Sequence, residues 1–230
     1  MIIRDLDIIE KGCVIIKAII FDFDGTLADT LPICFYAFQS VFKDLENRTV
    51  SPDEIKAMFG PSETGIIKKY LMPPNHDRAI NLYYEKYNER HQELVPENQE
   101  INDLLLFLKG EGYKLGIVTG KASKSLFISL NHLKMNRLFD VIITGDDVSF
   151  PKPHPEGLNK ALEQLNVQNT EAIFLGDSDA DLLAGKQANV YTIAVQWLPN
   201  FQNFEFKSQP DLKLTNINEF LPALNRLTHP

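Results

Sequence analysis

Two acidic segments of the chain carry residue types that suit phosphoryl transfer. Residues 22–27 read DFDGTL, and residues 176–181 read GDSDAD. A carboxylate can attack phosphorus and form an aspartyl-phosphate that water then cleaves. Asp22 and Asp24 are two residues apart, so in an extended segment they share a face, where one can attack while the other transfers protons. Gly25 would let the backbone turn sharply beside a phosphate.

The four aspartates Asp22, Asp24, Asp177 and Asp181 create an electrostatic problem if the fold brings them together. Carboxylates at close range cannot all stay ionised unless a cation joins them. A hard divalent cation with oxygen ligands meets this need. Mg²⁺ fits best, because it accepts a few carboxylates together with water and phosphate oxygens.

Two further polar residues could serve a phosphoryl group. Thr119 and backbone N–H groups can donate hydrogen bonds to phosphoryl oxygens, and Lys152 can supply a fixed positive charge. Taken alone, Thr119 also fits a helix N-cap, and Lys152 fits a solvated loop between two prolines. Thr119 and Lys152 can bind a phosphoryl group only if the fold places them beside the aspartates.

Short apolar runs precede these polar residues and are typical of buried strands. Segments with apolar residues at helical spacing separate the later runs. This alternation predicts a parallel, Rossmann-like sheet with helices on both faces, an α/β fold. Ligands of such sheets bind beyond the carboxyl ends of the strands, so we expect the polar residues to converge on one edge. The predicted strands are residues 14–21, 115–118, 141–144, 172–175 and 192–195.

The stretch from 29 to 97 has a different pattern, with helical spacing and no convincing strand. Ile33, Ala37 and Val41 recur at every fourth position. Residues 51–54, SPDE, form a capping box with proline at the first helical position. We therefore expect an α/β catalytic core made of residues 1–28 and 98–230, with a small all-helical domain, residues 29–97, inserted after the first strand.

Composition and charge narrow the classes of function. The chain has 230 residues, 44% of them hydrophobic, and a formal net charge of −8. Nucleic-acid binding needs a surplus of lysine and arginine, so it is disfavoured. Cys13 and Cys34 lack disulfide or metal spacing, and no apolar run is long enough to span a bilayer. We expect a cytoplasmic protein with no nucleic-acid or membrane partner. Monomer and homodimer both stay open, and residues 1–12 have no assigned role.

Together these segments resemble the motifs of the haloacid dehalogenase superfamily. The segment 22–27 looks like its first motif, Thr119 like its second, Lys152 like its third, and residues 176–181 like its fourth. Order and spacing agree from about residue 17 to residue 223. The first and fourth motifs together are specific, whereas the single threonine and lysine would be weak alone.

The resemblance implies a role for each matched residue. Asp22 would be the nucleophile and a metal ligand, and Asp24 the general acid/base, with its backbone carbonyl on the metal. Asp177 would be the third protein ligand of Mg²⁺, supported by Asp181. The helical insertion would be a cap that closes over the site, excludes water and selects the leaving group. The residues that would hold the phosphoryl group are Gly25, Thr119, Gly120 and Lys152.

Within the superfamily, the chain is most similar to phosphoglycolate-phosphatase-like and pyrophosphatase-like members. This implies a Mg²⁺-dependent phosphoric monoester hydrolase, or a pyrophosphatase, acting on a small phosphorylated metabolite. A sugar phosphomutase is one alternative, although such enzymes usually carry an acid at the position of Gly176 and none at that of Asp181. A phosphonate-cleaving enzyme is another, and would need a cap lysine from among Lys56, Lys68 and Lys69. A non-catalytic binding module is the third.

Overall fold

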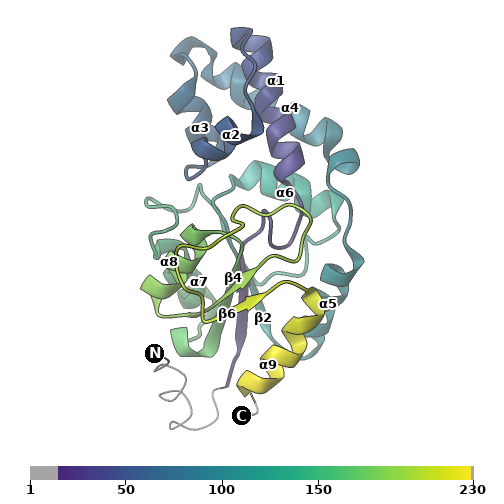
Figure 1. Cartoon of the computed structure of the whole chain (residues 1–230), viewed down its shortest axis with the longest axis vertical. Helices are drawn as coiled ribbons and strands as arrows, with labels where there is room; N and C mark the ends of the chain where they lie inside the picture. Colours follow the sequence, from purple (N-terminus) through teal and green to yellow (C-terminus); the bar gives the residue numbers. More distant parts are fainter. Residues whose placement is uncertain (1–14, 229–230) are drawn as a thin grey trace.

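Six parallel strands form one sheet at the centre of the computed structural model, which describes residues 15–228 (Figure 1). The strand order is β3-β2-β1-β4-β5-β6, and each neighbouring pair runs parallel. The predicted Rossmann-like α/β class is therefore confirmed. The strands are β1 (Ala18–Phe21), β2 (Lys114–Val118), β3 (Val141–Ile143), β4 (Ala172–Gly176), β5 (Tyr191–Val195) and β6 (Leu212–Leu214).

Both faces of the sheet are covered by helices, which explains why its strands read as continuous apolar runs. Ile19 and Phe21 of β1 pack in the layer that contains α5, α6 and α9, whereas Ala18 and Ile20 pack in the layer of α7 and α8. Figure 1 shows α5 and α9 on one side of the sheet and α7 and α8 on the other. These helices are α5 (Gln99–Gly110), α6 (Ser123–His132), α7 (Glu156–Leu165), α8 (Asp179–Ala188) and α9 (Phe220–Thr228), with 3₁₀ turns η2 (Asn169–Glu171) and η3 (Ile217–Glu219).

The segment between β1 and α5 is helical, and its helices gather beyond one end of the sheet (Figure 1). We call them the insertion helices: α1 (Leu31–Glu46), α2 (Pro52–Met58), α3 (Glu63–Tyr70) and α4 (His76–Leu94), with the 3₁₀ turn η1 (Pro73–Asn75). Helix α1 packs along α4, and α4 also contacts the core helix α6. The capping box at Ser51 is present, with reciprocal bonds to Glu54. That residues 29–97 act as a separate domain stays a prediction.

The structure adds one strand to those expected and moves some ends. The first strand begins at Ala18, and the third ends at Ile143. The sixth strand, β6, was not predicted because it is only three residues long and carries a lysine between two leucines. Residues 1–12 and Cys13 lie outside the described residues, and Cys34 is a buried free thiol. Among residues 15–228, no helix has the length and apolar character needed to cross a membrane.

The carboxyl ends of the central strands place the polar motifs at one edge. Asp22 follows β1, Thr119 follows β2, and Asp177 follows β4. The β1–β4 ladder extends one step further, because the backbone N–H of Asp22 donates to the carbonyl oxygen of Leu175 at 2.8 Å. The strand order reverses between β1 and β4, since β2 and β3 lie on one side of this pair and β5 and β6 on the other. Such a reversal is the place in an open α/β sheet where a crevice forms.

Candidate active site

Three buried carboxylates meet at this edge of the sheet. Asp22, Asp177 and Asp181 each offer an oxygen within 4.8 Å of the others. Asp22 and Asp177 are the first residues after β1 and β4, and Asp181 lies in the first turn of α8. The parallel topology therefore brings together residues that are more than 150 positions apart in the sequence. The structure places these three side chains where the sequence predicted them to converge.

The chemistry of the three carboxylates fits a hard divalent cation. Oxygen Oδ1 of Asp177 is buried and accepts no hydrogen bond from any described residue. Burial, reinforced by the neighbouring carboxylates of Asp181 and Asp22, raises the pKa of Asp177 well above its usual range. Burial also raises the pKa of Asp22 to about 7, although Lys152 opposes the shift. A bound cation would relieve this cost, because it favours the ionised forms and takes oxygen ligands.

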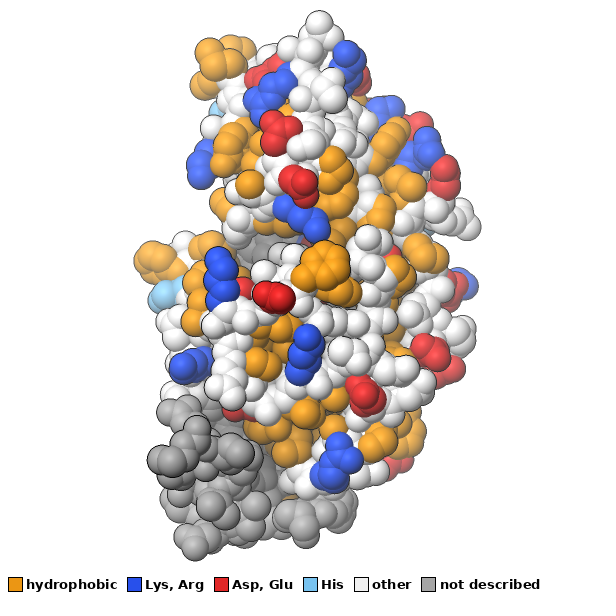
Figure 2. Space-filling view, in the orientation of Figure 1, with side chains coloured by type: hydrophobic (Ala, Val, Ile, Leu, Met, Phe, Trp, Pro, Cys, Tyr) orange, Lys and Arg blue, Asp and Glu red, His pale blue; other side chains and the backbone are white. Residues whose placement is uncertain are grey.

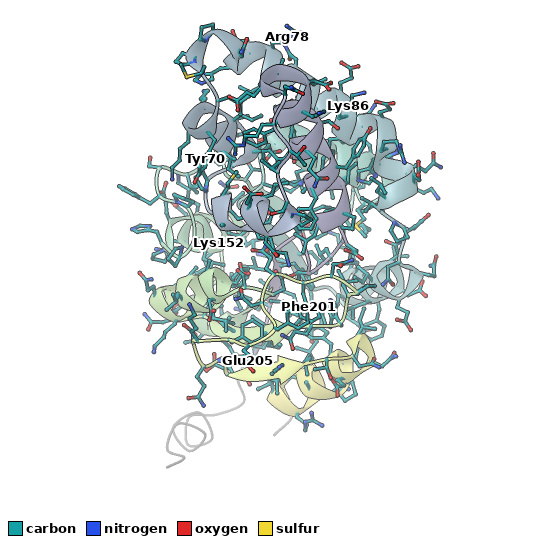
Figure 3. All side chains as sticks on the ribbon, turned by 45° about the horizontal axis from the view of Figure 1, so that its top comes forward. Tyr70, Arg78, Lys86, Lys152, Phe201 and Glu205 are labelled. Atoms are coloured by element: carbon teal, nitrogen blue, oxygen red, sulfur yellow. The ribbon has the colours of Figure 1, made fainter. Side chains whose placement is uncertain are left out.

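Lys152 is the cation that the protein itself supplies. Its Nζ lies 2.5 Å from Oδ1 of Asp181, 2.9 Å from Oδ1 of Asp22 and 3.3 Å from the carbonyl oxygen of Val118. Burial opposes its charge, but the carboxylates of Asp181 and Asp22 raise its pKa above the usual range of lysine. Figure 3 shows Lys152 on the α/β part of the molecule, below the insertion helices that carry Tyr70.

Asp24 stands apart from the carboxylate cluster. Its side chain accepts a hydrogen bond from Thr30 Oγ1 and lies 3.1 Å from Nζ of Lys121, measured at Oδ1. The carboxylate therefore points toward the insertion helices rather than toward Asp177. This is a suitable place for a group that exchanges protons with a leaving group. A metal contact through the backbone carbonyl of Asp24 stays a prediction.

Two glycines make room for the acidic cluster. Gly25 has a φ of +81°, and a Cβ at this position would overlap the carboxylate of Asp177. At Gly176, a Cβ would overlap the side chain of Asp181. Any larger residue at either position would therefore displace a carboxylate of the site. The sequence predicted the turn at Gly25, but it gave no sign of the close packing at Gly176.

A cavity of about 280 Å³ lies over this cluster, between the core and the insertion helices. Figure 2 shows the outline of the molecule indented at this junction. Thr119 and Gly120 line the cavity, and the Thr119 hydroxyl accepts a hydrogen bond from the backbone N–H of Lys121 at 3.2 Å. The other walls combine polar core residues with aromatic and apolar side chains of the insertion. Its lining includes Asp22, Asp24, Lys152, Asp179, Gln202, Leu31, Phe38, Lys56, Phe59, Glu63 and Tyr83.

The loop from 197 to 208 closes one side of the site, and sequence reasoning missed it. The backbone N–H of Gln202 donates to Oδ2 of Asp177 at 2.5 Å. Asp179 anchors the same loop, because its Oδ1 accepts from the backbone N–H groups of Lys207 and Ser208. Trp197 fixes the start of the loop by donating to the carbonyl oxygen of Thr26 at 2.8 Å. No periodic pattern marks this stretch, so only the fold reveals its contacts.

Lys121 and Glu63 are two further buried charged residues near the site. From the sequence, Lys121 suited either neutralisation of the site or an exposed surface position, and Glu63 was not expected there. The side chain of Lys121 is only 2% exposed, and its Nζ lies between Asp24 and the ring of Tyr87. Burial opposes the charge of Lys121, but Asp24 and other neighbours raise its pKa well above the usual range. Glu63 comes from helix α3 and reaches the core. In the sequence, the one sign of a role for Lys121 in the site was its position directly after Thr119 and Gly120.

Comparison with known proteins agrees with this geometry. Pyrophosphatase PpaX of Bacillus mycoides (strain KBAB4) is 32% identical over 212 residues, which cover 92% of this chain and 98% of the relative. Pyrophosphatase PpaX of Bacillus cereus (strain B4264) is 33% identical over 213 residues, with the same coverage. These relatives match nearly the whole chain.

Solved structures show the same fold. A predicted phosphoglycolate phosphatase from Haemophilus somnus superimposes with a TM-score of 0.81 at 22% identity, covering 91% of this chain and 98% of that one. CbbY from Rhodobacter sphaeroides, solved in complex with phosphate, gives a TM-score of 0.79 at 26% identity, covering 90% and 96%. The family model of haloacid dehalogenase-like hydrolases matches residues 19–195, from the first strand to the end of β5. With this match and the buried aspartates at the strand ends, the chain belongs to the haloacid dehalogenase-like hydrolases.

Proposed function

We propose that this protein is a Mg²⁺-dependent phosphatase that transfers the phosphoryl group of a small substrate to Asp22. One observation carries the proposal. Asp22 lies on the floor of the cavity, within 2.9 Å of the ammonium of Lys152 and beside the carboxylates of Asp177 and Asp181. A nucleophilic carboxylate flanked by a fixed cation and a cation-binding cluster is the arrangement that phosphoryl transfer requires.

The first step uses Asp22 and Asp24 in different roles. A carboxylate oxygen of Asp22 attacks phosphorus, the bond from phosphorus to the leaving oxygen breaks, and Asp24 gives that oxygen its proton. Lys152 and the hydroxyl and N–H groups near Thr119 neutralise the phosphoryl oxygens. In the second step water attacks the aspartyl-phosphate, Asp24 takes the proton of that water, and phosphate leaves. Asp22 is then restored.

The metal completes the charge balance of this site. Asp22 and Asp177 would hold Mg²⁺ through side-chain oxygens, Asp24 would contribute its backbone carbonyl, and Asp181 would support them through Lys152. When bound, Mg²⁺ supplies positive charge for the phosphoryl oxygens and keeps the carboxylates ionised. The backbone N–H of Gln202 meanwhile fixes the orientation of the Asp177 carboxylate.

The upper part of the cavity favours a small leaving group, and pyrophosphate or a small phosphomonoester fits it best. Two lysines line this part: buried Lys121, paired with Asp24, and half-buried Lys56, which forms no ion pair with any described residue. The volume of about 280 Å³ lies just below the range of ligand cavities, which span about 300–1,000 Å³. Relatives named pyrophosphatase, at 32–33% identity, further support pyrophosphate.

The phosphomutase alternative is less well supported. A β-phosphoglucomutase from Clostridium difficile has a TM-score of 0.77 to this chain. At 23% identity, this likeness shows the shared fold and not a shared activity. An acidic side chain at position 176 would overlap Asp181, which this chain retains. We therefore propose hydrolysis rather than isomerisation. The cap role of the insertion helices, the cytoplasmic location and the oligomeric state stay predictions.

The test is a phosphate-release screen on the purified chain with Mg²⁺ or with EDTA. Pyrophosphate, phosphoglycolate, sugar phosphates and nucleotides are the substrates to compare. We expect Mg²⁺-dependent release from a small substrate, and loss of turnover in Asp22→Asn with an unchanged circular dichroism spectrum. Substantial residual turnover in Asp22→Asn would refute the covalent mechanism. Net conversion between sugar phosphates without phosphate release would instead favour the mutase.

A further inference from the structure

Glu63 reaches from the insertion helices to the core, and both of its carboxylate oxygens accept hydrogen bonds there. It lies in the first turn of α3 and is 5% exposed. Its Oε2 accepts a hydrogen bond from the backbone N–H of Ala122 at 2.8 Å, and its Oε1 accepts from the hydroxyl of Ser125. Both donors belong to the beginning of the core helix α6. A buried carboxylate of this kind is stable only because these donors replace water.

Helix α6 has a specific need for this carboxylate. Its N-cap residue is Ala122, which has no side-chain acceptor for the free N–H groups of the first turn. Glu63 supplies one acceptor from the insertion helices, and Asp146 supplies another to the backbone N–H of Ser123 at 2.9 Å. Negative charge is also favoured at a helix N-terminus. The start of α6 is therefore completed by a residue of α3.

The contact is supported by close packing of the two loops around it. A Cβ at Gly145 would lie 3.1 Å from the side chain of Ser62, and one at Gly120 would lie 3.8 Å from the carbonyl oxygen of Gly60. The segment 60–63 of the insertion thus rests directly on the segment 119–122 of the core. The latter carries Thr119, which lines the floor of the cavity.

Lys121 links this contact to the proton-transfer group. It directly precedes Ala122, and its own carbonyl oxygen accepts from the backbone N–H of Gly145 at 2.8 Å. With the backbone fixed on both sides, its Nζ reaches Asp24, at 3.1 Å from Oδ1 and 3.4 Å from Oδ2. The ring of Tyr87, on helix α4, lies 4.6 Å from the same ammonium. Residues of the insertion and of the core therefore enclose it together.

We propose that Glu63 is a positioning residue for the acid–base step, and that docking of the insertion helices places Lys121 against Asp24 through it. The carboxylate of Glu63 fixes Ala122, the fixed backbone directs Lys121 into the site, and Lys121 together with Thr30 fixes the carboxylate of Asp24. The inference rests on the proposed function, because it assigns the proton transfer to Asp24. It explains why a charged residue of the insertion is buried against the start of α6.

The experiment compares Glu63→Ala and Glu63→Gln with the wild type and with Glu89→Ala, a matched control. Glu89 is an exposed glutamate of α4 whose one ion-pair partner among residues 15–228 is Lys86 at the surface. Each variant is assayed on an alkyl phosphate, which needs protonation of its leaving group, and on p-nitrophenyl phosphate, which needs little. Hydrogen–deuterium exchange over residues 119–127 reports the protection of the Ala122 amide independently of activity.

We expect Glu63→Ala to lower kcat for the alkyl phosphate about tenfold, a part of the 10²–10⁴ that a general acid contributes, and to lower it about threefold or less for p-nitrophenyl phosphate. Exchange at 119–127 should become faster. Glu63→Gln keeps an acceptor for the Ala122 N–H and should recover most of the loss. In Lys121→Met, adding Glu63→Ala should change little, because both act on Asp24 through one route.

Other results would overturn the inference. If Glu63→Ala slows both substrates equally, or if its effect adds fully to that of Lys121→Met, the route through Lys121 is refuted. If Glu63→Ala does not fold, Ser125→Ala decides, since it removes one of the two donors to Glu63. A smaller loss with the same leaving-group preference supports the proposal, and unchanged selectivity overturns it. A wild type that releases no phosphate would refute the proposed function and the inference with it, whereas the results above refute the inference alone.

Discussion

The ammonium of Lys152 lies 2.5 Å from Oδ1 of Asp181, in an ion pair whose side chains are 11% and 0% exposed. The other oxygen of Asp181 accepts from the backbone N–H and the hydroxyl of Ser178, so the carboxylate is held in place at the start of α8. Lys152 is thereby directed to within 2.9 Å of Asp22. Asp181 thus orients the ammonium of Lys152 toward Asp22, the proposed nucleophile.

Removal of Lys152 should lower the stability of the fold as well as the activity. In Lys152→Met, buried Asp22 and Asp181 lose their only lysine partner among the described residues. Breaking a buried pair from one side costs about 3–5 kcal/mol, and we expect urea unfolding in EDTA to show a loss of this size. Mg²⁺ should restore part of it. The control is Lys17→Met, whose exposed pair with Glu171 should contribute little to stability. Equal losses in both variants would contradict the role of Lys152.

The effect of removing the proton donor Asp24 on the reaction rate should depend on the leaving group. We expect Asp24→Asn to lower kcat/KM for an alkyl phosphate by about 10²–10⁴ and to affect p-nitrophenyl phosphate much less, because p-nitrophenolate leaves without protonation. Initial rates on the two substrates provide the measurement. Asp103→Asn, on the exposed side of α5, is the control for removing one negative charge. Similar losses on both substrates would rule out general acid catalysis by Asp24.

The metal-free protein should lose stability as pH rises toward neutrality. Burial raises the pKa of Asp22 from 3.8 to about 7, so between these values the folded state binds more protons than the unfolded state. The contribution of Asp22 to the free energy of unfolding therefore falls with increasing pH across this window, whereas His91, whose pKa burial lowers to about 4, opposes this trend below its usual 6.5. Asp177, whose pKa is also raised, acts in the same direction as Asp22.

Mg²⁺ should reverse this trend, because its binding needs ionised carboxylates and competes with protons. We expect the rise in Tm on adding Mg²⁺ to be larger at about pH 8.5 than at about pH 5.5, as thermal unfolding with Mg²⁺ and with EDTA would show. Asp22→Asn should weaken both pH dependences. A Mg²⁺-induced rise in Tm that is the same at every pH would mean that these carboxylates do not bind the ion.

The parts of the site that could be predicted are those that follow strands. Asp22, Thr119 and Asp177 each come directly after a buried apolar run, and parallel strands bring such residues to one edge whatever their separation in sequence. The strands and the α/β class followed from the same patterns, because both faces of the sheet are buried. Only the three-residue strand β6 was too short and too polar to be recognised.

The parts that could not be predicted depend on contacts between distant segments. The sequence around Lys121 does not show its partners, which include Asp24 of the core and Tyr87 of the insertion. Glu63 lies at the start of a helix, where acidic residues are common, so its sequence context gave no reason to expect a partner in α6. The contact of Gln202 with Asp177 is made by the backbone, which leaves no mark in the sequence.

Gly25 lies so close to Asp177 that a side chain at position 25 should disturb the carboxylate of Asp177. Gly25 and Gly112 both have positive φ, +81° and +86°, but a Cβ at Gly25 would overlap the Asp177 carboxylate, whereas at Gly112 it would meet nothing within 4 Å. Gly112→Ala should therefore cost only the left-handed backbone conformation, about 1–2 kcal/mol. Gly25→Ala should cost more in urea unfolding, and calorimetric titration should show weaker binding of Mg²⁺, while Gly112→Ala binds it as the wild type does. If the two variants lose the same stability and bind Mg²⁺ equally, the carboxylate of Asp177 moves aside without consequence and does not hold the metal.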